Sequence, residues 1–216
     1  MKQGWRGRWW WCSVVVAAAA CRSAAVPEEL YYRLPVPPAA AAAAVRGGVL
    51  RVQDLQLGTS IDADWLLRQD GVCVQPRPLA RWVAPLDRLV TDALLLGLSR
   101  ARVCELVKGA ADPGHETWSL RGRILEFGEV LAGPQAVARV GLELWLEVDD
   151  RVLFHDEFVA AVPVADAATP AAVHAMGEGL QQIVRAVVER MQAQDLFAAA
   201  ARARAAADGT PAGPGR

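Results

Sequence analysis

The chain has 216 residues, enough for one folded domain once terminal segments are set aside, and 53% of its residues are hydrophobic. Its 23 basic and 24 acidic residues are interspersed along the sequence and give a formal net charge of −1. This balance excludes the basic footprint of a nucleic-acid-binding protein and the polybasic patch of a peripheral membrane protein, so we expect no nucleic-acid partner.

The first twenty residues have the layout of a bacterial lipoprotein signal peptide. Lys2, Arg6 and Arg8 precede an apolar run over residues 9–20, and Ala18-Ala19-Ala20 lie directly before Cys21. Cleavage before Cys21, followed by acylation of its thiol and its new amine, would hold the mature protein at a membrane. Two alternatives stay open: secretion after cleavage without lipid, and a membrane span. A span needs roughly 20 apolar residues, which is longer than this run.

The segment that follows, residues 21–48, is rich in alanine and proline and predicts a lipidated tether. Within it, Tyr31 and Tyr32 predict a short strand where the tether meets the domain. Arg22 follows the anchor cysteine, at the position where Asp marks inner-membrane retention in many Gram-negative lipoproteins. We therefore expect the anchor in the outer membrane, facing the periplasm, and keep the inner membrane as the alternative.

The sequence pattern in the first half of the domain predicts three strands and a helix. The strands are expected over residues 49–57, 65–68 and 71–75. The last two flank a turn at Asp70-Gly71, a pair that favours tight turns. Apolar residues then recur at spacings of three and four from residue 86 to residue 101, which predicts an amphipathic helix with Pro85 in its first turn.

The sequence pattern in the second half of the domain predicts four more strands and a second helix. The strands are expected over residues 103–107, 118–129, 140–148 and 152–162. The apolar residues of the last two strands fall on even positions, which requires a connecting loop of odd length. We therefore expect Leu146 to pair with Phe154 and Leu142 with Phe158. Thr169, followed by proline, is a candidate N-cap for a long helix.

These elements predict an α+β fold, a single and mostly antiparallel sheet with two helices packed on one face. The domain is expected over residues 49–197, and the Ala/Gly/Pro-rich tail at 198–216 is expected to be disordered. The sheet face away from the helices carries polar residues and is a candidate contact surface. Its residues are Arg139, Glu143, Trp145, Glu147 and His155.

Two cysteines, Cys73 and Cys104, remain in the predicted domain. In an oxidising compartment they could form one disulfide, which we keep as a candidate. The alternative is two buried thiols that act as small hydrophobic side chains. The spacing of the two cysteines, without nearby histidines, matches no metal site, and we predict neither a metal nor a cofactor.

The sequence offers no set of residues for catalysis. It has no serine in a Gly-x-Ser-x-Gly turn and no glycine-rich loop that leads from a strand into a helix and could hold phosphate. Its three histidines are spread over a turn, a strand and a helix. Asp62 and Asp64 are expected to cap a loop rather than to bind calcium. We therefore predict that the protein is not an enzyme.

Three stretches resemble one known family. They are Leu57-Gly58-Thr59-Ser60-Ile61-Asp62-Ala63-Asp64, Leu66-Leu67-Arg68-Gln69-Asp70-Gly71 and Ala80-Arg81-Trp82-Val83-Ala84-Pro85-Leu86. Together with the lipoprotein signal and Tyr31-Tyr32, they resemble the ABC-type transport auxiliary lipoprotein family, which includes the PqiC-like lipoproteins. The resemblance implies a fold like the N-terminal domain of TolB and a docking role in intermembrane phospholipid transport. It further implies as partners an MCE-domain protein and the ABC permease and ATPase of the same system, and a ring-shaped homo-oligomer.

The candidate partner-binding residues come from these stretches and from the polar sheet face. They are Trp65, Arg68, Arg81, Trp82 and Trp145. Trp65 stands where relatives often carry arginine, and Trp145 could instead be covered by a neighbouring loop. The alternative function is a lipoprotein that binds lipid or assists envelope assembly without an ABC transporter. That function requires an apolar cavity between the sheet and the helices.

Overall fold

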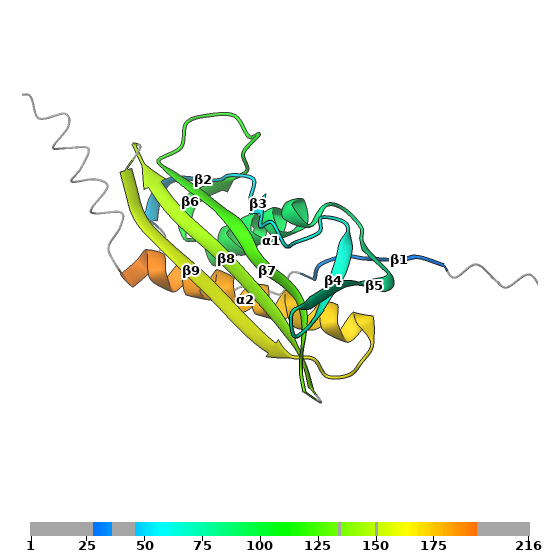
Figure 1. Cartoon of the computed structure of the whole chain (residues 1–216). Helices are drawn as coiled ribbons and strands as arrows, with labels where there is room; N and C mark the ends of the chain where they lie inside the picture. The colour runs from blue at the N-terminus through cyan, green and yellow to red at the C-terminus, as the bar shows by residue number, and fades with distance from the viewer. Residues whose placement is uncertain (1–27, 36–45, 134, 150, 194–216) are drawn as a thin grey trace, which may run out of the picture.

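The computed structural model describes residues 28–35, 46–133, 135–149 and 151–193. The predicted signal peptide, Cys21, most of the tether and the C-terminal tail lie outside these ranges. Within them the chain forms strands and two helices in an α+β fold, as predicted (Figure 1). The strands are β1 (Leu30–Tyr32), β2 (Arg46–Val52), β3 (Gln56–Leu57), β4 (Trp65–Asp70), β5 (Cys73–Trp82), β6 (Cys104–Lys108), β7 (Trp118–Ala132), β8 (Gln135–Val148) and β9 (Arg151–Pro163). The helices are α1 (Leu86–Ala101) and α2 (Thr169–Ala193).

One mixed sheet is built around the long strand β7. On one side β8 pairs with β7 in antiparallel over nearly its whole length, and β9 extends this meander. On its other side β7 pairs in parallel with β2, β3 and β4 in succession. β6 lies beyond β2, while β5 and then β1 lie beyond β4. The long ladders are therefore antiparallel, as predicted, and the short ones that position β2 and β4 are parallel.

The β8–β9 hairpin forms the two pairs that the apolar pattern predicts, but the expected loop of odd length is wrong. β8 ends at Val148 and β9 begins at Arg151, and the register shifts instead at a β-bulge between Leu146 and Glu147, where β9 has one extra residue. Leu146 pairs with Phe154 and Leu142 with Phe158, and all four side chains face the helices. Because side chains alternate along a strand, Trp145 faces the opposite side of the sheet, which we call the open face. The predicted pairs are confirmed because burying one face of each strand fixes the pairing.

A β-bulge in β7 changes which of its residues face the helices. The register with β8 shifts between Ile124 and Glu126, so inward positions are even-numbered before the bulge and odd-numbered after it. Ile124 and Phe127 therefore both pack in the core. The same shift turns Glu129 inward, where it is only 1% exposed. Simple alternation along the sequence does not predict this buried carboxylate.

The two helices cover one sheet face and touch each other, so the core lies in a single layer between sheet and helices (Figure 1). The two helices meet at Gly97 of α1, which faces Val184 of α2. A Cβ atom on Gly97 would lie 2.9 Å from Val184 Cγ1, closer than real Cβ contacts come. The absence of a side chain at residue 97 therefore sets how closely α1 and α2 approach.

The folded part of the chain begins before residue 49, contrary to the predicted boundary. β1 pairs in parallel with β5, with Tyr32 opposite Trp82. Leu34 is 4% exposed and belongs to the core. Pro35 packs against Gly177 of α2, where an added Cβ would meet its ring at 2.6 Å. Residues 30–35 are thus part of the domain, and the tether that precedes the described domain ends by about Glu29.

The candidate disulfide does not form. Cys73 is exposed at the start of β5, Cys104 is buried at the start of β6, and both are free. Three strands, β4, β7 and β2, separate β5 from β6 in the sheet. Burial raises the pKa of the Cys104 thiol to about 12, so this side chain is neutral and acts as a small hydrophobe.

Candidate functional site

Two of the predicted contact residues, Trp65 and Arg81, lie together on the open face. They are directly opposite each other in the β4–β5 pair, and the Arg81 guanidinium carbon lies 4.3 Å from the centroid of the Trp65 ring. Their neighbours Leu66, Ala80 and Trp82 are buried on the helix side, so the alternation of the strands turns both residues outward. This stacking is a cation–π contact at the edge of the sheet next to β1.

Several exposed side chains surround this pair and form what we call the β1-edge surface. Tyr31 pairs with Arg81 across the β1–β5 ladder, and Val83 follows the end of β5. The surface consists of Tyr31, Trp65, Leu79, Arg81 and Val83, together with Leu30, which lies at the same edge but points to the helix side because it pairs with the buried Ala80. Glu29 lies beside it, with its carboxylate 3.6 Å from Arg81 Nε.

Trp82 does not contact a partner in this fold, so that prediction is wrong. Its ring is 4% exposed and packs edge-on against Phe127, with ring centroids 5.8 Å apart. Its backbone N–H donates to the Asp64 carbonyl at 2.8 Å. Trp82 is therefore a core residue that ties β5 to the loop before β4.

Arg68, which the sequence predicts to bind a partner, pairs instead with a carboxylate of its own chain, the buried side chain of Glu129. Arg68 Nε donates to Glu129 Oε2 at 2.8 Å, and Arg77 donates to both carboxylate oxygens at 2.8 and 3.0 Å. Arg77 also donates to Thr169 Oγ1 and to the Ala167 carbonyl, at the start of α2. This network joins β4, β5 and β7 to the second helix, so its role is structural.

The charge state of Glu129 follows from these bonds. Burial by itself would raise the pKa of Glu129, but the hydrogen bonds from Arg77 and Arg68 outweigh it and lower the pKa below its ordinary value. The carboxylate therefore stays ionised at neutral pH. Sequence reasoning missed Arg77 and Glu129 because the bulge in β7, and a second irregularity that places Arg77 opposite no residue of β4, are not visible in the apolar pattern.

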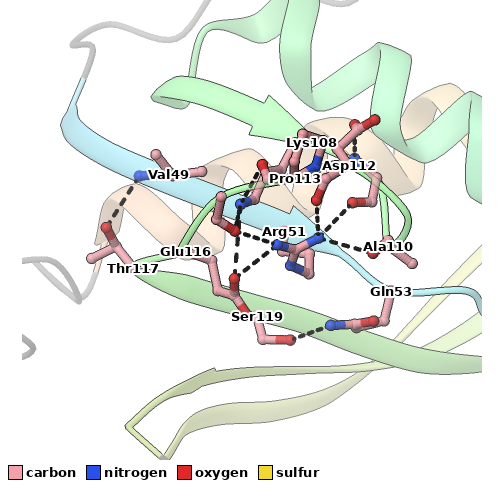
Figure 2. Close-up of polar contacts among 12 residues, drawn as sticks. Val49, Arg51, Gln53, Lys108, Ala110, Asp112, Pro113, Glu116, Thr117 and Ser119 are labelled. Carbon is pink, nitrogen blue, oxygen red and sulfur yellow. Dashed lines mark hydrogen bonds and ion pairs between the residues drawn. The ribbon is translucent and has the colours of Figure 1, made fainter.

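A second polar network surrounds Arg51 of β2, whose side chain is only 10% exposed (Figure 2). Its guanidinium lies inside the loop that joins β6 to β7, residues 109–117, which we call the β6–β7 loop. It donates to four backbone carbonyls at 2.7–3.0 Å and pairs with the Glu116 carboxylate at 3.0 Å. The carbonyls belong to Gly109, Ala110, Asp112 and Gly114.

Further bonds close the same loop. Lys108, 5% exposed, donates from its ammonium group to the Gly114 carbonyl, and Asp112 accepts the Gly109 N–H at 2.7 Å. Thr117 and Val49 exchange two hydrogen bonds that fix the end of the loop to β2. The hydrogen bond from Arg51 lowers the pKa of Glu116. The β6–β7 loop is thus held in one shape by buried cations, although its outer side chains are exposed.

Trp145 lies on the open face next to this loop. It is half-buried, and its ring meets that of His155 edge-on with centroids 5.6 Å apart. Glu143 binds both His155 Nε2 at 2.8 Å and Arg123 Nε at 2.6 Å. Trp145 pairs in register with Arg121, which lines a polar pocket between the β6–β7 loop and the β8–β9 turn.

We call this region the loop-side surface. It consists of Trp145 and the pocket residues His115, Glu116, Thr117, Ser119, Arg121, Glu147, Val148 and Asp149. Figure 1 places the β6–β7 loop and the β8–β9 turn at the upper left of the molecule and β1 at the right. The predicted contact residues therefore fall into two separate surfaces, one around Trp65 and Arg81 and one around Trp145.

The loop-side surface is mostly polar. Its charged side chains pair with one another, as Arg121 does with Glu147 at 3.1 Å. Trp145 does not line the polar pocket but borders it, opposite Arg121 in the β7–β8 ladder.

Among the residues that the structure describes, no group of three His, Cys, Asp or Glu side chains is arranged to hold a metal ion. In the same part of the chain, neither helix is long and apolar enough to cross a membrane.

Comparisons with known proteins agree with this fold. Residues 32–188 match the family model described as ABC-type transport auxiliary lipoprotein component. The structure is similar to protein XCC0632 from Xanthomonas campestris, of the DUF330 family, at 18% identity and a TM-score of 0.68, over 81% of this chain and 99% of that one. A second, uncharacterized protein is similar at 15% identity and a TM-score of 0.63, over 77% and 100%. At these identities the likeness shows the fold alone, and no curated protein matches the sequence.

Proposed function

Since the chain belongs to the family of ABC-type transport auxiliary lipoprotein components, we propose that it is the membrane-anchored docking component of an ABC system that moves phospholipid between membranes. The family is described as auxiliary to transport and not as a group of enzymes. The observation that supports the proposal is the separation of two features. β1, which follows the predicted tether in the sequence, lies at one edge of the sheet, and the loop-side surface lies at the other side (Figure 1).

The anchor in this proposal is Cys21. Cleavage before it and acylation would leave the domain on the periplasmic side of a membrane, and Arg22 favours the outer membrane. Palmitate labelling of the wild type and of Cys21→Ala, followed by separation of the two membranes, tests both parts. Label in the wild type only, in the outer-membrane fraction, supports the proposal. Label in the inner-membrane fraction would move the docking role to the transporter's own membrane.

The partner surface in this proposal is the loop-side surface. Trp145 borders the polar pocket through its register partner Arg121, and tryptophan is one of the residue types that contribute most to binding energy at protein interfaces. The buried bonds of Arg51 hold the β6–β7 loop in shape before any partner arrives, so little ordering entropy is lost on binding. We propose that an MCE-domain protein, working with the ABC permease and ATPase of the same system, docks here.

A gene deletion tests this function in the cell. Loss of a lipid-transport component weakens the outer-membrane barrier, so the deletion strain is expected to become sensitive to detergent. Wild-type protein restores resistance, whereas Cys21→Ala and Trp145→Ala do not. Full resistance of the deletion strain, or full rescue by Trp145→Ala at wild-type protein levels, speaks against a docking role for the loop-side surface.

The structure gives little support to the alternative, a lipoprotein that carries lipid itself. The layer between sheet and helices is filled by side chains with almost no exposure, such as Leu94, Leu144 and Ile183. The pocket on the open face beside Leu67 and Leu125 has a volume of about 70 Å³. The pocket of the loop-side surface has a volume of about 280 Å³, but it is lined mostly by polar residues and lies outside the layer between sheet and helices. Sites for drug-sized ligands occupy roughly 300–1,000 Å³, and a phospholipid is larger still. Native mass spectrometry that finds co-purified phospholipid would revive the alternative.

A further inference from the structure

We propose that the β1-edge surface rests against the headgroup layer of the membrane that holds the anchor. This inference rests on the acylation of Cys21 in the proposed function. It assigns Trp65 and Arg81 to a lipid contact, whereas Trp145 and the β6–β7 loop face the protein partner. The mature lipoprotein would then have a fixed orientation, with one surface on the bilayer and the other directed into the periplasm.

The length of chain between the anchor and the domain supports this placement. Eight residues lie between Cys21 and Leu30, the first residue of β1, so nine residue-to-residue steps join the anchor to the domain. Even fully extended, they span only about 30 Å. A domain of roughly this size has a radius of gyration of about 15 Å, so the tether cannot lift it by more than about one diameter. Because β1 is where the tether joins, the β1 edge is the part of the domain nearest the lipid.

The apolar side chains at this edge fit such a contact. Of the ten large apolar residues that are exposed in the described ranges, four lie within two short segments at the β1 edge. They are Leu30 at 55% exposure, Tyr31 at 60%, Leu79 at 36% and Val83 at 49%. Val83 is held next to β1, since its N–H donates to the Tyr32 carbonyl at 2.9 Å. Exposed apolar groups gathered in this way mark an interaction surface.

The polar residues at the edge specify the kind of partner. Tyr31 and Trp65 are the residue types that concentrate at membrane–water interfaces, where an aromatic ring meets apolar and polar surroundings at once. Arg81 lies over the Trp65 ring with its side chain 32% exposed, in a position to donate to a lipid phosphate. Glu28 and Glu29 offset Arg33 and Arg81 in charge, so the contact depends on apolar and aromatic groups and not on anionic lipid.

A matched pair of labels tests the inference in the acylated, full-length mature protein. Cys73, the exposed thiol, is replaced by serine, and a polarity-sensitive fluorophore is attached at Val83→Cys or, as the control, at Val159→Cys. The two positions are 49% and 51% exposed, and Val159 lies on β9, at the other side of the sheet. The proteins are reconstituted into vesicles of phosphatidylethanolamine and phosphatidylglycerol that contain brominated lipid.

The label at position 83 is expected to shift to the blue and to be quenched by brominated lipid about twofold more than the label at position 159, because it enters the headgroup region. Changing the share of phosphatidylglycerol is expected to leave the difference unchanged. Equal quenching at both positions in a palmitate-labelled protein overturns the inference and leaves the proposed function standing. Shielding of position 83 in detergent without lipid overturns it too, and indicates a second copy at this edge. Absence of palmitate removes the anchor, and the inference fails with it.

Discussion

Arg77 Nε lies 2.8 Å from Glu129 Oε2, and both side chains are almost completely buried, at 8% and 1% exposure. The pair links two strands of the sheet to the first turn of α2 through Thr169. A carboxylate in this position is stable only because two arginines donate to it. Substitutions at this contact therefore test how strongly it holds the sheet and α2 together.

Replacing Glu129 with glutamine is expected to destabilise the domain by about 3 kcal/mol, because it leaves the Arg77 charge buried without a counter-ion. Urea unfolding of the domain measures this loss. The control is Glu147→Gln, which removes a carboxylate from the ion pair with the exposed Arg121. That substitution is expected to cost no more than about 1 kcal/mol. Equal costs for the two variants would contradict the structural role of Glu129.

The lowered pKa of Glu129 predicts how stability depends on pH. A carboxyl whose pKa is lower in the folded than in the unfolded state adds stability above its unfolded pKa, and this stability disappears as the pH falls through its folded pKa. The wild type should therefore lose stability on acidification below the ordinary value of 4.5. Glu129→Gln should lose less over the same range. Parallel curves of unfolding free energy against pH would show that another group controls the acid response.

Arg51 is expected to hold the β6–β7 loop in shape. Arg51→Met removes the donors to four carbonyls, and Arg51→Lys keeps the charge without the planar fork that bridges them. Both variants should speed amide hydrogen exchange in residues 109–117, with Arg51→Met costing about 3 kcal/mol of stability. Arg139→Met, which removes an arginine that is 44% exposed, serves as the control. Unchanged exchange in the loop of Arg51→Met would contradict this account.

Close packing of the two helices at Gly97 is expected to make this position intolerant of a side chain. Gly97→Ala places a methyl group 2.9 Å from Val184 Cγ1, and the strain should outweigh the better helix propensity of alanine for a net loss of about 1–2 kcal/mol. Gly47→Ala, where nothing lies within 4 Å of the added Cβ, should change stability by no more than about 0.5 kcal/mol. Thermal unfolding of both variants measures the difference. A stabilised Gly97→Ala would show that the helices can move apart at no cost.

The apolar pattern predicts the parts of the fold that depend on strict alternation or helical spacing. The pairs Leu146–Phe154 and Leu142–Phe158 follow from two strands that each bury one face. Tyr31 and Tyr32 predict the short strand that the structure has as β1. The core position of Leu34 does not follow, because the proline- and alanine-rich residues around it have the composition of a linker.

The candidate site was only partly predictable for related reasons. The family resemblance predicts Trp65, Arg81 and Trp82 as contact residues. Whether each of these side chains faces the core or the solvent depends on strand register, which the resemblance does not give. This is why Trp82 is buried while Arg81, its neighbour, lies on the open face. Arg51 stands between two buried residues of β2, and its role depends on a loop almost sixty residues later in the chain. No local pattern connects the two.

The most direct test of the docking function is affinity purification of the acylated protein from cross-linked cell envelopes, with mass spectrometry of what it captures. The wild type is expected to recover an MCE-domain protein together with the permease and ATPase of one ABC system. Trp145→Ala is expected to reduce this recovery by about tenfold or more, as loss of a central interface tryptophan does, while Val159→Ala leaves it unchanged. A wild-type protein that recovers no ABC component, or a Trp145→Ala variant that recovers the same amount, would contradict the account.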